Sequence, residues 1–280
     1  MAEHIYDTPD VTIIKPSSGW SAINFRELAR YRELLYFLTW RDIKIRYKQT
    51  VLGAAWAILQ PFFTMVIFTI FFGKIAKIPS EGVPYPIFSY AGLLPWTYFA
   101  NAVSLSSNSL VGSSHLITKV YFPRLFVPMG STLAGLLDYL IAPSILVVMM
   151  IWYGLAPTFS ILILPLLVLL CFFAATGIGM WLSALNVRYR DIRYVVPFLI
   201  QLWLFATPVI YPTSLLPERY RWAMALNPMA GIIETHRAVI LSNKPIDAAM
   251  LAVSAAIIVM IFVTGAFYFK RMDRSFADVI

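Results

Sequence analysis

A few ionisable side chains lie within or beside apolar sequence, and these are the first candidates for chemistry. Glu234, His236 and Arg237 lie within four positions and could transfer protons as a general acid–base site. A structural ion pair, or the lining of a ligand path, would use the same residues and is the interpretation we favour. Asp138 is the only acid inside a long apolar stretch. It could belong to a proton relay, but without an obvious basic partner we favour interior hydrogen bonding or helix pairing.

Sequence motifs for enzymatic chemistry are missing. The Gly-Lys pair at Gly73-Lys74 is followed by Ile75 and preceded by Phe68 where a phosphate loop needs glycine, so the chain has no ATP-binding loop. HExxH, GxSxG and CxxC do not occur, and the three histidines are scattered. The single cysteine, Cys171, lies in an apolar run and is interpreted as a packing residue. We therefore predict no metal site and no cofactor on this chain.

The chain is rich in aromatic residues, with 43 Phe, Trp and Tyr. Many of them lie near the predicted ends of apolar stretches, where an interfacial aromatic belt accounts for most. Flat rings also stack on sugars, so a wide path lined with them could let a polymer slide. The candidates for lining such a conduit are Trp96, Tyr98, Phe99, Trp203, Phe205 and Tyr211.

Composition indicates which elements must position these residues. Apolar residues make up 60% of the 280 positions and charged residues only 13%, about half the share of a soluble domain. Five charge-free stretches are 22 to 49 residues long. Because about 20 apolar residues cross a bilayer as a helix, the chain is predicted to be a polytopic helical membrane protein. A net charge of +8 is then a topological signal rather than a sign of nucleic-acid binding.

Six transmembrane helices are predicted. Their expected ranges are 51–73, 87–111, 128–153, 161–185, 194–211 and 248–269. The second carries Asn101, Asn108 and several serines, so it should face protein or a water-filled path. No cleavable signal peptide is apparent, and the first span would itself direct insertion.

The distribution of basic residues predicts the orientation. With the N-terminus in the cytoplasm, 16 of the 22 Lys and Arg lie on the cytoplasmic side and six outside. Both termini are therefore expected in the cytoplasm.

Two further segments are expected not to span. Residues 25–49 interleave aromatic and basic residues, which predicts an amphipathic helix along the inner headgroup layer, with a soluble helix that packs on a partner as the alternative. Its candidate contact residues are Arg41, Lys44, Arg46 and Tyr47. Residues 212–244 contain apolar pieces that are too short to cross and are broken at Asn227-Pro228, which predicts re-entrant outer helices. The expected fold class is an all-α integral membrane protein with these two additions.

Several stretches of the sequence resemble one family in order along the chain. They are RDIKIRYKQTVLGAAWAILQP (41–61), LLPWTYFANAV (93–103), LITKVYFPR (116–124), NVRYRDI (186–192), FATPVIYP (205–212) and LNPMAGIIETHR (226–237). Together they resemble the permease subunits of polysaccharide and polyol-phosphate ABC exporters, which include the O-antigen (Wzm), capsule (KpsM) and teichoic acid (TagG) permeases.

That resemblance implies a half-transporter that forms a homodimer around a conduit for a lipid-linked polysaccharide in the bacterial cytoplasmic membrane. Two separate ATP-binding cassette subunits would hold ATP and magnesium. A coupling helix to them is implied at Ser113, His115, Leu116, Lys119, Tyr121 and Arg124. An outer gate is implied at Asn227, Pro228, Glu234, His236 and Arg237. The implied organisation is a cytoplasmic segment 1–24, an interface helix 25–49, a permease domain 50–270 and a cytoplasmic tail 271–280.

Three other functions stay open as alternatives. A secondary transporter would need charged ion sites and often an internal repeat, and the sequence offers little beyond Asp138. A membrane glycosyl or lipid transferase would need convergent acids, which are missing. An ABC permease for a smaller amphipathic substrate or drug shares the six-span layout and is the nearest rival.

Overall fold

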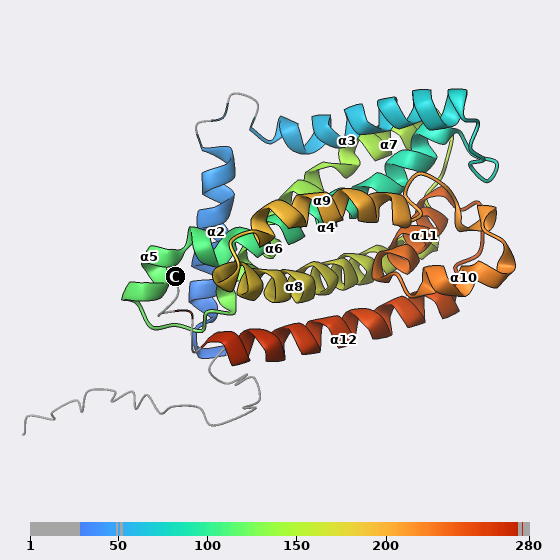
Figure 1. Cartoon of the computed structure of the whole chain (residues 1–280). Coiled ribbons are helices and arrows are strands. Elements are labelled where there is room, and N and C mark those ends of the chain that lie inside the picture. Colours follow the sequence, from blue (N-terminus) through green and yellow to red (C-terminus); the bar gives the residue numbers. More distant parts are fainter. Residues whose placement is uncertain (1–28, 49, 51–52, 274–275, 277–280) are drawn as a thin grey trace, which may run out of the picture.

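The computed structural model describes residues 29–48, 50, 53–273 and 276 (Figure 1). The predicted segment 1–24, the first residues of the predicted interface helix and part of the predicted tail lie outside them. Throughout the described ranges, the regular structure is helical and no strand occurs. The elements are α2 (Arg32–Tyr47), α3 (Ala55–Phe68), η1 (Thr69–Ile75), α4 (Tyr85–Gly112), α5 (Ser114–Lys119), α6 (Phe126–Ile141), α7 (Pro143–Trp152), η2 (Phe159–Ile163), α8 (Leu164–Arg188), α9 (Ile192–Ala206), η3 (Thr213–Leu215), α10 (Glu218–Ala225), α11 (Pro228–Leu241) and α12 (Ala248–Met272).

Four helical stretches of the described chain are long and apolar enough to cross a membrane. They are Ala55–Ile75, Phe126–Trp152, Phe159–Arg188 and Ala248–Met272. They coincide with the first, third, fourth and sixth predicted spans. The α4 helix has 28 residues but is too polar for that set, and α9 is apolar but has only 15 residues.

The polar helix α4 lies at the centre of the bundle and packs against α3, α6, α8 and α11. Ser106 is fully buried on it and donates to the Pro128 carbonyl of α6 at 3.3 Å. A Cβ on Gly179 of α8 would lie 2.1 Å from the Ser106 hydroxyl oxygen, so the close approach of α8 requires glycine. The expectation that this helix faces protein rather than lipid is confirmed.

The fifth predicted span is shorter than expected. Residues 194–211 were predicted to be one helix, whereas α9 ends at Ala206. Thr207 is extended (φ −108°, ψ 142°) because it precedes Pro208, and the ring of a proline disfavours helical backbone at the residue before it. Residues 207–212 therefore form an irregular stretch that must find its hydrogen bonds elsewhere.

Figure 1 shows that the bundle has two distinct ends. At one end α2 runs across the direction of the long helices, with α5 and the C-terminal end of α12 close by; we call this the α5 end. At the opposite end lie α10 and α11; we call this the α11 end. The side chains with polar chemistry gather at these two ends, so the candidate sites are described from one to the other.

Candidate functional site

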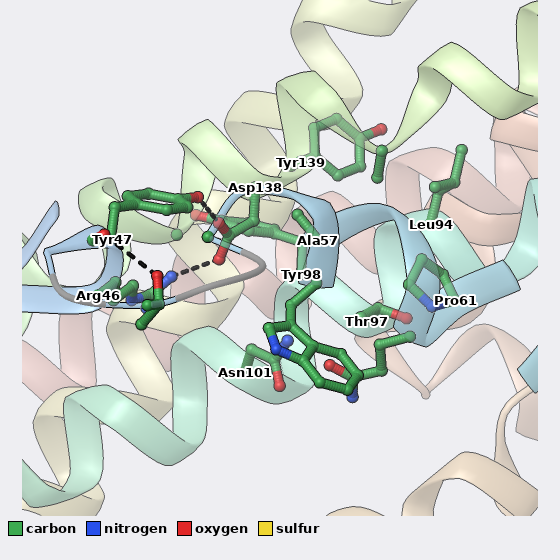
Figure 2. Close-up of a pocket in the computed structure, with 16 residues that line it drawn as sticks. Arg46, Tyr47, Ala57, Pro61, Leu94, Thr97, Tyr98, Asn101, Asp138 and Tyr139 are labelled. Carbon is green, nitrogen blue, oxygen red and sulfur yellow. Dashed lines mark hydrogen bonds and ion pairs between the residues drawn. The ribbon is translucent and has the colours of Figure 1, made fainter. Parts of the chain in front are cut away.

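At the α5 end, a polar cluster joins α2 to α6. Arg46 and Tyr47, at the end of α2, both contact the Asp138 carboxylate of α6 through an ion pair and a hydrogen bond (Figure 2). We call these three residues the inner cluster. Partial burial, and then the hydrogen bond to Asp138, raise the pKa of the Tyr47 phenol, which keeps it a neutral donor. Asp138 therefore has a basic partner that the sequence did not reveal, and helix pairing accounts for it.

The rest of α2 packs on α6 in the same direction. Ser131 donates to Asp42 at 2.8 Å, and Leu38 is buried where Gly130 lets the two backbones approach closely. On the remaining surface Lys44 lies over the exposed Trp40 ring, and other large apolar side chains are exposed, among them Tyr36, Phe37 and Ile45. The described part of the predicted interface helix is thus helical, with one face packed on α6 and the other exposed. Its placement in the headgroup layer stays a prediction.

A cavity of about 160 Å³ opens beside the inner cluster, between α2, α3, α4 and α6. Figure 2 shows Arg46 and Tyr47 directed at Asp138, with Thr97 and Asn101 of α4 also on the cavity wall. Aromatic and polar side chains both contribute to its lining. The lining includes Trp56, Gln60, Tyr98 and Tyr139 besides these residues. We call this space the inner cavity.

The predicted conduit aromatics separate into two groups. Trp96, Tyr98 and Phe99 on α4 are buried, with exposed fractions of 5%, 4% and 0%. Their rings pack inside the chain, Phe99 against Trp203 with ring centres 5.2 Å apart, and the Tyr98 hydroxyl donates to the Thr132 carbonyl at 3.3 Å. In the single chain these three rings contact protein, apart from the part of Tyr98 that lines the inner cavity. The conduit hypothesis therefore cannot use Trp96 or Phe99 as an open surface in this conformation, because their rings are enclosed by the bundle.

The other three predicted conduit residues lie nearer the surface. Phe205 is 53% exposed, and Trp203 and Tyr211 are half-buried. Tyr211 donates to the Phe205 carbonyl at 3.1 Å, and Trp203 donates to the side-chain oxygen of Asn227 at 3.2 Å. The aromatic group on α9 is thus connected to the predicted gate.

Asn227 joins α9 to α11. Its side-chain oxygen accepts from the backbone of Met229 at 3.1 Å, which caps the first turn of α11, and Pro228 occupies the first helical position. Its amide nitrogen donates to the Thr207 hydroxyl at 2.9 Å and to the Ala206 carbonyl at 3.3 Å. The predicted break at Asn227-Pro228 is confirmed as the boundary between α10 and α11.

Arg237 holds the irregular stretch after α9. Its guanidinium is fully buried and donates to the carbonyls of Phe88 (3.2 Å), Pro208 (2.5 Å), Val209 and Tyr211 (3.5 Å). It also lies 3.8 Å over the centre of the Phe88 ring. A Cβ on Gly92 would lie 2.4 Å from the guanidinium, so glycine leaves the space that this side chain fills. Five donors in a rigid plane match such a set of carbonyls.

Three more charged residues surround Arg237. Glu234 lies 3.3 Å from the Arg237 guanidinium and also contacts Lys244, which in turn lies 2.7 Å from Glu81. We call Glu81, Glu234, Arg237 and Lys244 the outer network. Because these charges neutralise one another and bind backbone, the structure favours the structural interpretation of Glu234 and Arg237 over an acid–base site.

His236 points the other way, toward α6. Its Nε2 lies 3.2 Å from the Tyr139 hydroxyl, and the ring is 2% exposed. The histidine is therefore separated from Glu234 and Arg237 in its contacts. Among the described residues no group of three His, Cys, Asp or Glu lies together as a metal site would require.

The predicted coupling segment forms a short helix, α5, at the opposite end. Ile117 is buried beneath it and Leu116 is half-buried, whereas His115, Lys119 and Tyr121 are exposed. Ser113 stands at the N-cap position of this helix but makes no capping hydrogen bond; its hydroxyl accepts from Arg41 of α2 at 3.3 Å. The Arg41 contact therefore joins the start of α5 to α2.

Arg124 ends the segment differently from the other predicted coupling residues. It donates to the Asp273 backbone carbonyl at 2.5 Å and pairs with the Asp273 carboxylate at 3.1 Å. It therefore fixes the α5 loop to the end of α12, and the exposed surface of the segment is formed by its neighbours.

Sequence reasoning missed residues whose role depends on contacts between distant segments. Lys244 and Glu81 complete the outer network across 163 positions of sequence separation. Trp56, Gln60, Thr97 and Asn101 meet only in the inner cavity. The polar residues inside apolar stretches were the available signal, since such residues are costly to expose to lipid.

Comparison with known proteins gives a consistent set of matches. The ABC-2 type transporter family model matches residues 33–241. An O-antigen export system permease protein RfbA from Myxococcus xanthus is 31% identical over 91% of this chain and 98% of its own length. An RfbA from Klebsiella pneumoniae is 26% identical over 89% of this chain and 95% of its own. The polysialic acid transport protein KpsM of Escherichia coli is 26% identical over 83% of this chain and 91% of its own.

Proposed function

Because the chain belongs to the ABC-2 type transporter family, we propose that it is the transmembrane half of an ATP-driven exporter of a lipid-linked polysaccharide. The observation that carries this proposal is its similarity, over nine-tenths of its length, to permeases named for O-antigen export. The similarity to a polysialic acid transport protein supports the broader class of polysaccharides. The membrane would be the bacterial cytoplasmic membrane.

The topology we propose has six crossings, with α4 and α9 added to the four apolar stretches. The α5 end would face the cytoplasm with both termini, because α2, α5 and the charged turn between α8 and α9 lie there together with most of the basic residues. The α10–α11 pair would be re-entrant from the outer side. Its backbone at membrane depth is tolerated because α11 is enclosed by protein.

Two copies of the chain would form the conduit, and two ATP-binding cassette subunits would supply the energy. ATP and magnesium would bind those subunits, since this chain has no phosphate loop. The α5 helix supports a coupling role because it is anchored by Ile117 and Leu116 while His115, Lys119 and Tyr121 face outward. A short anchored helix transmits a displacement without deforming.

The conduit surface would come from exposed aromatic side chains on helices with little cover in the protomer. On α9, Tyr194, Phe198 and Phe205 are exposed, and on α3, Phe63 is exposed. These faces would meet across a homodimer. They take the place of Trp96 and Phe99, which are enclosed within one chain.

The central experiment is complementation with a matched biochemical control. In a strain that lacks its own O-antigen permease, this chain and its cognate ATPase should together restore surface polymer, whereas the chain with a Walker-defective ATPase should not. The purified chain alone should hydrolyse no ATP. ATP turnover by the isolated permease, or failure of the intact pair to export any polysaccharide, would contradict the proposal.

Orientation is tested with single cysteines in a Cys171→Ala background. A cysteine at Ser214, which is exposed at the α11 end, should react with an impermeant thiol reagent applied to intact cells. One at Arg190, exposed between α8 and α9, should react only after lysis. Asn186 is unsuitable for the inner position because it is 2% exposed and bonded to Ser107, so it would stay unlabelled on either side. The reverse labelling would invert the topology.

A further inference from the structure

The inner cavity contains hydrogen-bonding capacity that the described part of the chain does not use. Gln60, Thr97 and Asn101 line it, Gln60 being exposed and the other two half-buried, and no side chain of the three forms a hydrogen bond with another described residue. Pro61 adds to this set, since it has no N–H to donate to the carbonyl of Ala57, which also lines the cavity. The volume of about 160 Å³ far exceeds the roughly 15 Å³ that one water needs.

An aromatic surface borders these polar groups. Trp56 lines the cavity and is 56% exposed, so more than half of the side chain is open to a ligand. Tyr47 of α2 and Tyr98 of α4 also line the cavity. An acyl chain would leave the amides unsatisfied, which is costly in an apolar environment. A ring with an apolar face and several hydroxyl groups satisfies both parts of the lining.

The charge of the cavity discriminates between the parts of a lipid-linked glycan. Among the described residues of its lining, Arg46 and Asp138 are the charged ones, and they form an ion pair with each other. The cavity therefore has no net positive charge to offer a phosphate, whose recognition normally requires unpaired Arg or Lys. The Asp138 carboxylate would repel such a group further. A neutral polyhydroxyl ligand carries no such penalty.

We propose that the inner cavity is a saccharide subsite that holds one sugar ring of the exported polysaccharide. Trp56 stacks on the ring, and Gln60 and Asn101 exchange hydrogen bonds with its hydroxyl groups. Thr97 and the free Ala57 carbonyl complete the polar side, and Arg46 and Asp138 define its edge. This subsite rests on the proposed function for its ligand. Its lining reaches from Arg46 of α2 to Tyr139, which contacts His236 of α11, so it would hold a sugar in the middle part of the bundle.

Direct binding of simple glycosides tests the subsite. The full-length chain in lipid nanodiscs is mixed with methyl glycosides of mannose, galactose, rhamnose and N-acetylglucosamine, and saturation-transfer NMR reports contact. At least one glycoside should give a signal that Trp56→Ala weakens about tenfold, the size expected for loss of a stacking face. Trp56→Phe should keep most of the signal. Trp222→Ala removes an exposed indole on α10, outside the cavity, and should change nothing.

Two further variants separate binding from folding. Asn101→Ala and Gln60→Ala remove side chains without described partners, so each should weaken the glycoside signal while the chain elutes as the wild type does on size exclusion. If Trp56→Ala fails to fold, these two variants decide the question. Equal signals in all variants and the wild type would overturn the subsite.

Inorganic pyrophosphate is the competing probe for the lipid-linked phosphate. It should neither bind the nanodisc-embedded chain, by phosphorus line broadening, nor displace a glycoside. Pyrophosphate binding that Asn101→Ala removes would overturn the saccharide assignment in favour of a phosphate site. The absence of binding by every probe would overturn it in favour of a water-filled space.

The outcomes also separate this inference from the proposed function. Binding by the isolated chain requires neither ATPase nor export. Restored surface polymer without glycoside binding would remove the subsite and leave the exporter. Cavity-dependent glycoside binding without any polymer export would leave the subsite and remove the exporter.

Discussion

The two ends of the bundle differ in whether their polar side chains are buried or exposed. At the α11 end all fourteen residues of α11 are buried, and the Arg237 guanidinium binds backbone carbonyls that α9 leaves free. At the α5 end, basic and aromatic side chains such as Lys119, Tyr121 and Trp40 are exposed. The helix α11 is enclosed within one chain, whereas the α5 end presents a surface that a partner can cover.

The difference has a physical consequence for motion. Breaking the contacts of Arg237 would leave a buried charge and several carbonyls unsatisfied, which opposes any local opening. The inner cluster is less enclosed, with side chains of Arg46 and Asp138 that are 20% and 27% exposed, so water can replace its contacts at lower cost. We therefore expect the α11 end to behave as a fixed frame and α2 to be the element that shifts.

The largest expected effect is at Arg237. Arg237→Met keeps the length but removes every donor, so several buried carbonyls and Glu234 lose their partner, and we expect destabilisation of about 3–5 kcal/mol. Thermal unfolding in detergent should show a large drop in midpoint, with poor yield. Arg219→Ala, at an exposed arginine on α10, is the control and should unfold like the wild type. A stable, normally expressed Arg237→Met would contradict the fixed frame.

The next effect is at the α5 surface. Leu116→Asp places a charge at a half-buried position that anchors α5, and Tyr121→Ala removes an exposed ring two residues beyond the end of the helix. Each should lower co-purification of the ATPase and polymer-stimulated turnover at least about tenfold, because a buried unpaired carboxylate or a lost anchor weakens the contact. Thr118→Ala, exposed on the same helix, is the matched control. If the Leu116→Asp/Tyr121→Ala double variant couples normally, the coupling site moves to the turn at 188–191.

A smaller effect is expected at the inner cluster. Asp138→Asn keeps the shape but removes the charge that pairs with Arg46, and partial exposure limits the loss to about 1 kcal/mol. A double-mutant cycle with Arg46→Met, followed by thermal unfolding, isolates the pair. A coupling free energy near zero would show that α2 is held by its apolar contacts alone.

The smallest effect is at the exposed edge of the outer network. Lys244 is 24% exposed in its side chain and pairs with Glu81 at 2.7 Å, so Lys244→Ala should cost up to about 1 kcal/mol. Added salt should lower the unfolding midpoint of the wild type more than that of the variant, since screening acts on the exposed pair. Lys119→Ala at the other end is the control. A loss of stability as large as that of Arg237→Met would mean that the four charges of the outer network contribute cooperatively.

Residue type and periodicity predicted most of the helices. The charge-free stretches located the four apolar spans, and the serine and asparagine content of 87–111 predicted that α4 faces protein. The break at Asn227-Pro228 was also visible, because proline and a capping residue act locally. The early end of α9 was missed although Pro208 is in the sequence, since helical membrane segments often tolerate a proline and only the neighbouring contacts decide.

The sequence by itself determined that the chain is a helical membrane protein with basic residues gathered at one set of loops, because hydrophobicity and charge act residue by residue. Only the tertiary structure decided which polar residues meet. Asp138 pairs with Arg46, which is 92 positions away in the sequence, and Arg237 donates hydrogen bonds to backbone carbonyls of the stretch that follows α9. Trp96 and Phe99 were predicted to line an open path, but in the folded chain their rings are buried. A side chain's partner depends on the distances that folding creates between helices, and no local pattern contains those distances.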